Sequence, residues 1–388
     1  MMKILDIYKK LNCPSIVINY REDRLIAIKA ITSENLDSGI LYYKEYFVID
    51  KKSETIEIRK SFKDMYNICT EDTCENLFFT TYDIRDNKYY LQFYKIFLNK
   101  HYTEELIYEI EIDGGLLSTG FINLNCVIKA LNDRYIICWY KDEGQNFSVH
   151  TKVVLIDTIN RTGNYLNTND SLLNCDFSGI KITGTQENKK IIIKTGSIGN
   201  LEKYEFSKNS NNICDEKLLL YDSSTFIQNV IQNNELLGKE IEFKKDEGTF
   251  ELIDATDKSI LYAVCLFDKE SSLITSYDYK KDEKAILISD EYIYDYDYYK
   301  QFNENVYGIK ITDCTVQIDN LISKKVFEYK FDIYAPYVVF YDERKVVLEF
   351  LVPNQKVVIY DIDNLTVINE FINRKADYFI ENDTLVLH

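Results

Sequence analysis

The residues best suited to chemistry in this sequence form one stretch rich in tyrosine and aspartate. Asp290–Tyr299 reads Asp-Glu-Tyr-Ile-Tyr-Asp-Tyr-Asp-Tyr-Tyr. Side chains alternate between the two faces of a β-strand, so four tyrosines would share one face and two aspartates the other. Aromatic rings beside carboxylates suit the binding of a sugar, a cationic side chain or an ammonium group. We therefore predict a ligand-binding strand that contains Tyr292, Tyr294, Asp295, Tyr296, Asp297 and Tyr298.

A purely structural explanation of this stretch stays open. The tyrosine rings can pack between neighbouring sheets while the carboxylates lie in a turn or a solvated channel. The pairs Asp295/Asp297 and Asp361/Asp363 offer oxygen ligands for Ca²⁺, which needs about six to eight of them. Neither pair lies in an aspartate-rich loop with the required glycine, so we interpret both as turn residues and predict no metal and no cofactor.

Other catalytic and metal-binding patterns are missing from the sequence. The three histidines, His101, His150 and His388, lie far apart. Cys69 and Cys74 are close in sequence but would need metal ligands from elsewhere in the chain. The nine cysteines are scattered singly, which is typical of reduced, buried cysteines in a cytoplasmic protein. The sequence therefore predicts no catalytic residue.

The charge of the chain disfavours two classes of partner. Lys and Arg number 46 against 63 Asp and Glu, which gives a net charge of −17. Nucleic acids and anionic membranes both attract basic surfaces, so we expect neither as a partner. No apolar run reaches about 18 residues, and the first ten residues do not resemble a signal peptide. We expect a cytoplasmic protein; a protein partner would have a basic surface, although solubility alone also explains the charge.

Short apolar runs separated by polar turns recur along the whole chain. The clearest set lies at residues 337–341, 345–351, 356–361 and 365–371, where three short turns join four runs. Similar sets begin near residues 15 and 126. Four strands joined by tight turns form a β-meander, so the pattern predicts an all-β fold. We expect residues 1–388 to form a single domain.

A recurring aspartate indicates the length of the repeat. The third strand of several sets ends in an apolar residue followed by aspartate, and other residues stand at the equivalent position in the remaining sets. We call these positions marks; the seven marks are Asp50, Asn99, Asp157, Phe206, Tyr279, Asp319 and Asp361–Asp363. Their mean spacing of about 52 residues is close to the roughly 40–50 residues of a four-stranded propeller blade. We predict a β-propeller of seven four-stranded blades, with eight blades as the second choice. An acidic residue before a polar turn is also a sound way to end a strand.

Two segments carry a resemblance to a known class of repeat. Lys356–Val367 and Lys152–Thr158 resemble the repeat of bacterial YVTN-type and related WD40-like propellers. The resemblance implies the propeller architecture and no particular activity. Two stacked β-sandwiches or an open β-solenoid are the alternative architectures.

Two further segments depart from the four-strand repeat. Tyr378–Glu381 and Thr384–Leu387 form two extra strands, which would close the ring with the N-terminal segment Lys3–Tyr8 or form a partial eighth blade. Ser224–Leu237 has apolar residues at helical spacing. We predict a short helix there, between blades, with Ser223 or Ser224 as its cap.

Two functions fit this architecture, because propellers bind partners with loops on one face or along the central axis. The first is a non-catalytic cytoplasmic binding or scaffold module that mediates protein–protein interaction. The second is a propeller enzyme or binder that acts on a small or saccharide ligand in the central channel. A deep funnel with converging carboxylates or histidines would favour the second function. A flat apolar or acidic patch on one rim would favour the first.

Overall fold

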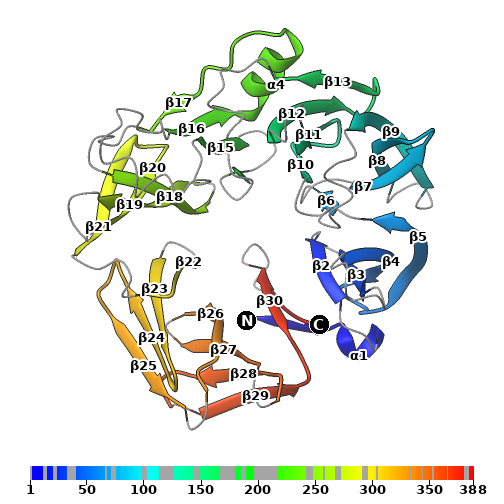
Figure 1. Cartoon of the computed structure of the whole chain (residues 1–388). Coiled ribbons are helices and arrows are strands. Elements are labelled where there is room, and N and C mark those ends of the chain that lie inside the picture. The colour runs from blue at the N-terminus through cyan, green and yellow to red at the C-terminus, as the bar shows by residue number, and fades with distance from the viewer. Residues whose placement is uncertain are drawn as a thin grey trace.

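The strands of the computed structural model radiate from a central axis as eight separate sheets, which form a ring (Figure 1). The structure describes residues 2–388 except 12–14, 21–23, 33–40, 66–67, 71–75, 98–102, 113–125, 144–148, 167–179, 185–188, 196–216, 242–247, 257, 267–271, 291–295, 303–304, 332–333, 343, 352–353, 365 and 380–383. We call the sheets blades 1 to 8. Blades 1 to 7 each contain four consecutive antiparallel strands, and blade 8 contains three strands.

The strands of blades 1 to 4 come from the first two thirds of the chain. Blade 1 contains β2 (Ser15–Tyr20), β3 (Arg24–Thr32), β4 (Leu41–Asp50) and β5 (Ile56–Met65). Blade 2 contains β6 (Ile68–Thr70), β7 (Asn76–Arg85), β8 (Lys88–Phe97) and β9 (Thr103–Ile112). Blade 3 contains β10 (Cys126–Ala130), β11 (Tyr135–Glu143), β12 (Val149–Asp157) and β13 (Thr162–Tyr165). Blade 4 contains β14 (Ile180–Thr183), β15 (Lys190–Thr195), β16 (Lys217–Asp222) and β17 (Lys239–Glu240).

The remaining blades complete the ring. Blade 5 contains β18 (Gly248–Ala255), β19 (Ser259–Leu266), β20 (Ser272–Asp278) and β21 (Glu283–Asp290). Blade 6 contains β22 (Tyr298–Phe302), β23 (Asn305–Thr312), β24 (Thr315–Asn320) and β25 (Val326–Lys330). Blade 7 contains β26 (Tyr337–Tyr341), β27 (Lys345–Phe350), β28 (Lys356–Asp361) and β29 (Thr366–Ile372). Blade 8 contains β30 (Ala376–Phe379), β31 (Thr384–Leu387) and β1 (Lys3–Asp6).

The predicted propeller is confirmed, but the described residues form eight blades rather than the preferred seven. The spacing of the aspartate marks counted only seven because blade 8 is built differently. Its third strand is β1, which comes from the other end of the chain and runs parallel to β31. A count based on four consecutive strands therefore cannot register it.

The hydrophobic core lies between blades rather than inside any one of them. Successive side chains of a strand point to opposite faces of its sheet, so Leu77 and Phe79 contact blade 1 whereas Phe78 contacts blade 3. Similar clusters of buried side chains fill the space between each pair of neighbouring blades. The inner strands of neighbouring blades, such as β26 and β30, contact one another around the axis.

Strand β1 joins the two ends of the ring. Leu5 and Ile7 are buried against blade 1, whereas Ile4 packs against the cluster that blade 8 shares with blade 7. The Arg374 guanidinium lies 3.0 Å from the Asp6 carboxylate and stacks on the Tyr8 ring at 4.2 Å. These contacts attach β1 to blade 1 on one side and to blades 7 and 8 on the other.

The two helices in the described part of the chain are short. Helix α1 spans Tyr8–Leu11, and helix α4 spans Ser223–Ile231. The predicted helix is confirmed, but it connects β16 to β17 within blade 4 rather than joining two blades. Its N-cap residue is Asp222 rather than a serine, and Asp222 makes no side-chain capping hydrogen bond. Helix α4 buries Phe226, Ile227 and Val230 against blades 3 and 4, so packing rather than capping holds it.

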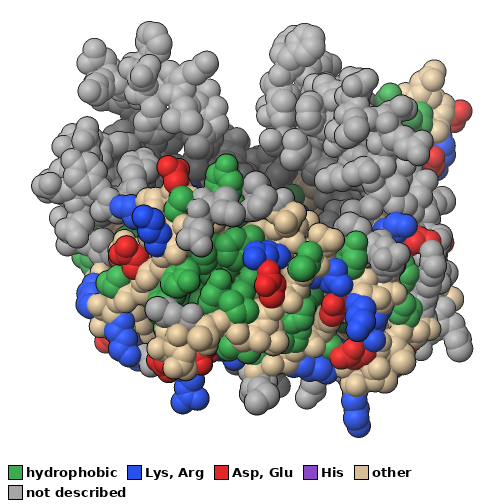
Figure 2. Space-filling model, turned by 90° about the horizontal axis from the view of Figure 1, so that it is seen from below, with side chains coloured by type: hydrophobic (Ala, Val, Ile, Leu, Met, Phe, Trp, Pro, Cys, Tyr) green, Lys and Arg blue, Asp and Glu red, His purple; other side chains and the backbone are tan. Residues whose placement is uncertain are grey.

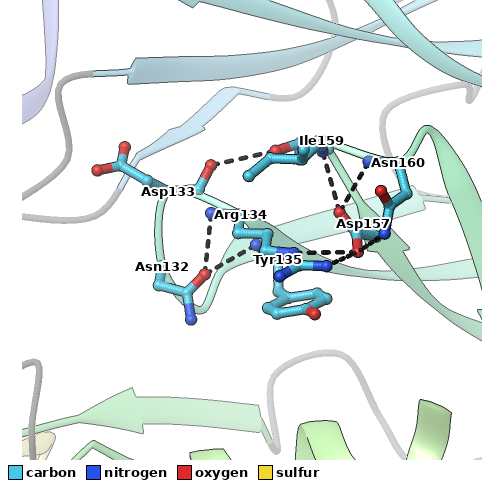
Figure 3. Close-up of polar contacts among 8 residues, drawn as sticks. Asn132, Asp133, Arg134, Tyr135, Asp157, Ile159 and Asn160 are labelled. Carbon is cyan, nitrogen blue, oxygen red and sulfur yellow. Dashed lines mark hydrogen bonds and ion pairs between the residues drawn. The ribbon is translucent and has the colours of Figure 1, made fainter.

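The recurring aspartates hold the turns between the third and fourth strands (Figure 3). The Asp157 carboxylate accepts the N–H groups of Ile159 and Asn160, each at 3.0 Å, and the Arg134 guanidinium at 2.8 Å. Equivalent turn N–H groups are bound by Asp50 and Asp361. In blades 5 and 6 they are bound by Asp278 and Asn320 rather than by the marked Tyr279 and Asp319. Asp50, Asp157 and Asp361 therefore have a structural role at the turns; Asn99 and Phe206 lie outside the described residues.

Replacing Leu5 by alanine tests the closure of the ring. Leu5 is 2% exposed between blades 8 and 1, so the substitution should lower the free energy of unfolding by about 2–5 kcal/mol. The measurement is urea unfolding followed by circular dichroism. Ile84→Ala is the control, because Ile84 is 63% exposed and its loss should cost less than about 0.5 kcal/mol. Equal effects of the two substitutions would contradict this account of closure.

Asp157→Asn tests the turn network through its pH dependence. Burial raises the pKa of Asp157, but hydrogen bonds from Arg134 and from the turn N–H groups outweigh it and leave the pKa below the ordinary value of 3.8. The charged form therefore stabilises the fold above the unfolded-state pKa, and this contribution disappears as pH falls through the lower folded-state pKa.

The free energy of unfolding of the wild type should exceed that of Asp157→Asn at pH 6, and the difference should shrink between about pH 4 and pH 2. Urea titrations across this range measure both proteins. Asp83→Asn is the matched control, since Asp83 lies on the surface, where a lost ion pair with Arg85 is worth little. A difference between wild type and Asp157→Asn that does not change with pH would refute the role given to the carboxylate.

Candidate functional site

Three of the six predicted site residues lie in the described part of the chain: Tyr296, Asp297 and Tyr298. Tyr292, Tyr294 and Asp295 lie outside it. Strand β22 begins only at Tyr298, and Tyr296 and Asp297 precede it. The alternation of a regular strand therefore does not extend through the three residues, and the structure places each of them differently.

Tyr296 packs between blades 5 and 6. Its ring lies 5.6 Å from that of Tyr299, and its hydroxyl donates a hydrogen bond to the Asp319 carboxylate. The ring also covers Gly308, where a Cβ atom would come within 2.7 Å of it. A side chain at residue 308 would displace the ring, so glycine there permits this packing. Tyr296 is thus placed as a packing residue.

Asp297 attaches the segment to the neighbouring strand β23. Its N–H donates to the carbonyl of Ile309 at 2.9 Å, and its carboxylate accepts the N–H of Ile311. The side chain is exposed. One carboxylate oxygen therefore accepts the backbone N–H group of Ile311 on β23, while the other remains available to solvent.

Tyr298 lies on the opposite side of blade 6 from Tyr296, among the residues packed against blade 7. Its hydroxyl accepts the N–H of Val338, on inner strand β26, at 2.9 Å. Burial raises the pKa of Tyr298 to about 12, so the hydroxyl stays protonated at neutral pH. The expectation that the tyrosines share one face does not hold for Tyr296 and Tyr298, because the strand starts between them.

Lys300 is a polar residue of this strand that the sequence prediction missed. It shares a face of β22 with Tyr298 and Phe302, and its ammonium nitrogen lies 6.0 Å and 5.8 Å from the centres of their rings. Burial lowers the pKa of Lys300, whereas the negative charges of Asp377, Asp254 and Glu349 act in the opposite direction. The signal in the sequence was its position two residues after Tyr298, which places both on one face.

The three carboxylates near Lys300 come from three other blades. Asp377 lies on inner strand β30 of blade 8, and His388 Nε2 lies 3.0 Å from its carboxylate. Glu349, on β27, accepts the N–H of Ala376 at 3.2 Å. Asp254, on inner strand β18, accepts the N–H of Ala255 at 2.8 Å. Lys300 and these three carboxylates therefore belong to four different blades, 5 to 8.

The described part of the chain offers little support for a metal site or a reactive thiol. No group of three or more His, Cys, Asp or Glu residues there is arranged to hold a metal ion. Cys126 and Cys138 are buried with their sulfur atoms 3.6 Å apart, and burial raises the pKa of Cys69 to about 12. Burial also raises the pKa of Cys138, so the thiols of Cys69 and Cys138 are protonated at neutral pH. Cys74, His101 and the side chain of His150 lie outside the described residues.

A second candidate surface lies on the rim, where the outer parts of blades 6 and 7 meet. Phe327 and Tyr329 of β25 lie beside Tyr360 of β28, with the Tyr329 and Tyr360 rings 5.7 Å apart, above the buried side chains of Val346 and Leu348. The depression between them has a volume of only about 10 Å³. Figure 2 shows hydrophobic side chains gathered over this side of the ring. We call this feature the rim groove.

The outer strand next to the rim groove is unusually apolar for an exposed edge. In β29, Val367 and Ile368 are each 50% exposed and Ile372 is 63% exposed. Among the described side chains, each of the other outer strands exposes at most one large hydrophobic residue, such as Ile286 of β21 or Val326 of β25. None of the described helices is long and apolar enough to cross a membrane.

Comparisons with known proteins show the fold and no closer relationship. No family profile and no curated protein matches this chain. Among solved structures, one of prolyl endopeptidases matches with a TM-score of 0.53 at 7% identity, covering 92% of this chain and 49% of that one. A structure of the Dos1 propeller matches with a TM-score of 0.49 at 12% identity, covering 97% of this chain and 90% of that one.

Acylaminoacyl peptidase from Pyrococcus horikoshii matches with a TM-score of 0.47 at 12% identity, covering 97% of this chain and 56% of the peptidase. This chain therefore spans about half the length of the peptidases that it matches. At these identities the similarity extends to the β-propeller architecture alone.

Proposed function

We propose that this propeller is a non-catalytic protein-binding module, whose rim groove and strand β29 receive an extended segment of a partner protein. The segment would carry hydrophobic side chains for the groove and lysine or arginine beside them. The observation that carries the proposal is the three large hydrophobic residues exposed along β29 beside the groove, Val367, Ile368 and Ile372.

Exposed apolar side chains on an outer strand are costly for a protein that lacks a partner. Such a strand offers both hydrophobic contacts and unpaired backbone groups to other chains, and proteins usually protect it with charged residues. In β29 all residues except Phe371 are exposed, and only Glu370 is charged. A contiguous apolar patch on a soluble protein typically marks an interaction site. Among the side chains that the structure describes, the other outer strands lack this composition, and the patch lies on blade 7.

The rim groove offers an aromatic surface rather than a pocket for a small molecule, because its volume is only about 10 Å³. Its walls are the rings of Phe327, Tyr329 and Tyr360, which are partly buried, and its floor is closed by Val346 and Leu348. Partly exposed tyrosine and phenylalanine rings supply large contact areas at a small cost in side-chain entropy. A hydrophobic side chain of a partner would extend the existing contact between blades 6 and 7.

Charge indicates that the partner segment is basic. Asp361 lines the rim groove, and hydrogen bonds from Asn364 hold the pKa of Asp361 below its ordinary value, so the residue is charged. The net charge of the chain is −17, which favours the approach of a cationic segment over an anionic one. The expected partner is therefore a basic, extended segment with hydrophobic residues at alternate positions.

A peptide-display selection against the purified protein tests this function. A random 12-residue library should yield peptides that combine hydrophobic residues with lysine or arginine, and replacing their basic residues by glutamate should weaken binding. The double variant Ile368→Thr/Ile372→Thr should weaken binding of a selected peptide at least tenfold, or about 1.4 kcal/mol, as measured by fluorescence anisotropy. Threonine keeps the β-propensity of both positions.

Ile286→Thr is the matched control, because Ile286 is 59% exposed on outer strand β21 of blade 5 and its replacement should leave peptide binding unchanged. Selection of no specific peptide, or of peptides that bind the double variant as tightly as the wild type, would exclude this surface as the binding site.

A further inference from the structure

We propose that the partner segment adds to blade 7 as a fifth strand, antiparallel to β29, with a hydrophobic residue opposite Ile372 and a lysine or arginine opposite Glu370. This inference rests on the proposed function and specifies the direction and the register of the bound segment. From its N-terminus to its C-terminus, the recognised sequence is then a hydrophobic residue, any residue and a basic residue.

The outer edge of β29 has backbone groups that can bind another strand. Among the described strands, β29 pairs only with β28. Their antiparallel register continues to Asn373, whose N–H donates to the carbonyl of Gln355 at 2.7 Å. The backbone groups of successive residues in a strand point to opposite sides. Those of Phe371 therefore point toward β28, and those of Glu370 and Ile372 point away from it.

The side chains of the same two residues lie on the face of blade 7 that carries the rim groove. Residues that are opposite one another in a sheet point to the same face, and Glu370 and Ile372 lie opposite Val358 and Lys356. Alternation along β28 puts Tyr360, which lines the groove, on this face as well. A strand that pairs with Glu370 and Ile372 would therefore place the opposite side chains beside the rim groove.

The two positions favour different side chains in the partner. Ile372 is 63% exposed, so a hydrophobic residue opposite it would remove apolar surface of both chains from water. The side chain of Glu370 is 43% exposed, and Lys356 donates to its Oε1 atom at 2.8 Å. The other carboxylate oxygen can accept a hydrogen bond from a lysine or arginine of the partner. Opposite charges on facing residues of neighbouring strands stabilise the pairing.

The direction of the added strand follows from the outward backbone groups. In antiparallel pairing, one residue exchanges both of its hydrogen bonds with the residue directly opposite, and this pairing is slightly more stable than the parallel one. Glu370 can form both bonds. The carbonyl of Ile372 also accepts Arg374 Nη1 at 3.2 Å, but a carbonyl oxygen has two lone pairs. The register with β28 shifts just before Asn369, so regular pairing is expected from there to Ile372.

Two blocked nine-residue peptides of identical composition test the order of the motif. The first has isoleucine at its fourth position and arginine at its sixth in a threonine background, and the second exchanges these two residues. Fluorescence anisotropy should show that the first binds at least threefold more tightly. Equal affinities, or no binding of the first peptide at 1 mM, would overturn the antiparallel register.

N-methylation of single peptide amides tests the backbone pairing. The N–H of the arginine opposite Glu370 faces β29, so its methylation should weaken binding of the first peptide at least tenfold. The N–H of the preceding threonine points away from β29, so its methylation is the matched control and should change the affinity less than threefold. Equal losses at the two positions would refute the addition of a fifth strand.

A charge reversal assigns the basic position. Glu370→Lys should weaken binding of the first peptide at least threefold and strengthen binding of a peptide with glutamate in place of arginine. Glu328→Lys is the control, because Glu328 is an exposed residue of outer strand β25 in blade 6 and makes the same change in net charge.

Equal effects of Glu370→Lys and Glu328→Lys would reflect net charge alone and would overturn the register. The proposed function is decided separately by the selected peptides and their response to Ile368→Thr/Ile372→Thr. Peptides that lose affinity for this double variant but show neither the motif nor the methylation pattern would support the binding surface and exclude the fifth strand.

Discussion

Each blade of this ring has hydrophobic side chains on both faces, and only a neighbouring blade on either side can cover them. In the middle strands, consecutive residues such as Ile136, Ile137 and Cys138 are fully buried because they point alternately to two different neighbours. An open row of blades would leave two apolar faces in water. The parallel strand β1 removes that exposure by packing Leu5 on blade 1 and Ile4 on the other side. The position of every other feature follows from this closed packing.

Closure also determines where polar residues can lie. Polar side chains that are buried in the blades need hydrogen-bond partners: in blade 2, Gln92 donates to Glu109 at 2.7 Å, and Lys95 donates to the carbonyl of Asp133 at 3.0 Å. At the turns, carboxylates such as Asp157 are satisfied by backbone N–H groups and arginine, which leaves little capacity for a ligand. On inner strand β22, Lys300 is half-buried beside the rings of Tyr298 and Phe302.

Local patterns in the sequence predicted the strands, the meander and the helix at Ser223–Ile231 well, because alternation and turn residues act over a few positions. They were weaker where distant segments meet. The predicted closure of the ring by Lys3–Tyr8 and Thr384–Leu387 is confirmed, because β1 pairs with β31. The spacing of the aspartate marks could not show that this shared sheet is a blade of its own, so the preferred blade count was one short. The face shared by Tyr296 and Tyr298 was wrong because a strand boundary cannot be located from composition alone. Asp377 and Lys300 are 77 positions apart in the chain, so only ring closure brings them near each other.

The seam between blades 6 and 7 links the axis to the rim through a continuous series of ring contacts. Phe302, beside Lys300, contacts Tyr307 at 5.9 Å, and Tyr307 contacts Tyr341 at 5.1 Å. Tyr341 in turn contacts Phe327, on the wall of the rim groove, at 5.8 Å. Since protein interiors are close-packed, removing a ring from the middle of this series would loosen both ends. The rim groove and the aromatic residues beside Lys300 therefore belong to one packed cluster.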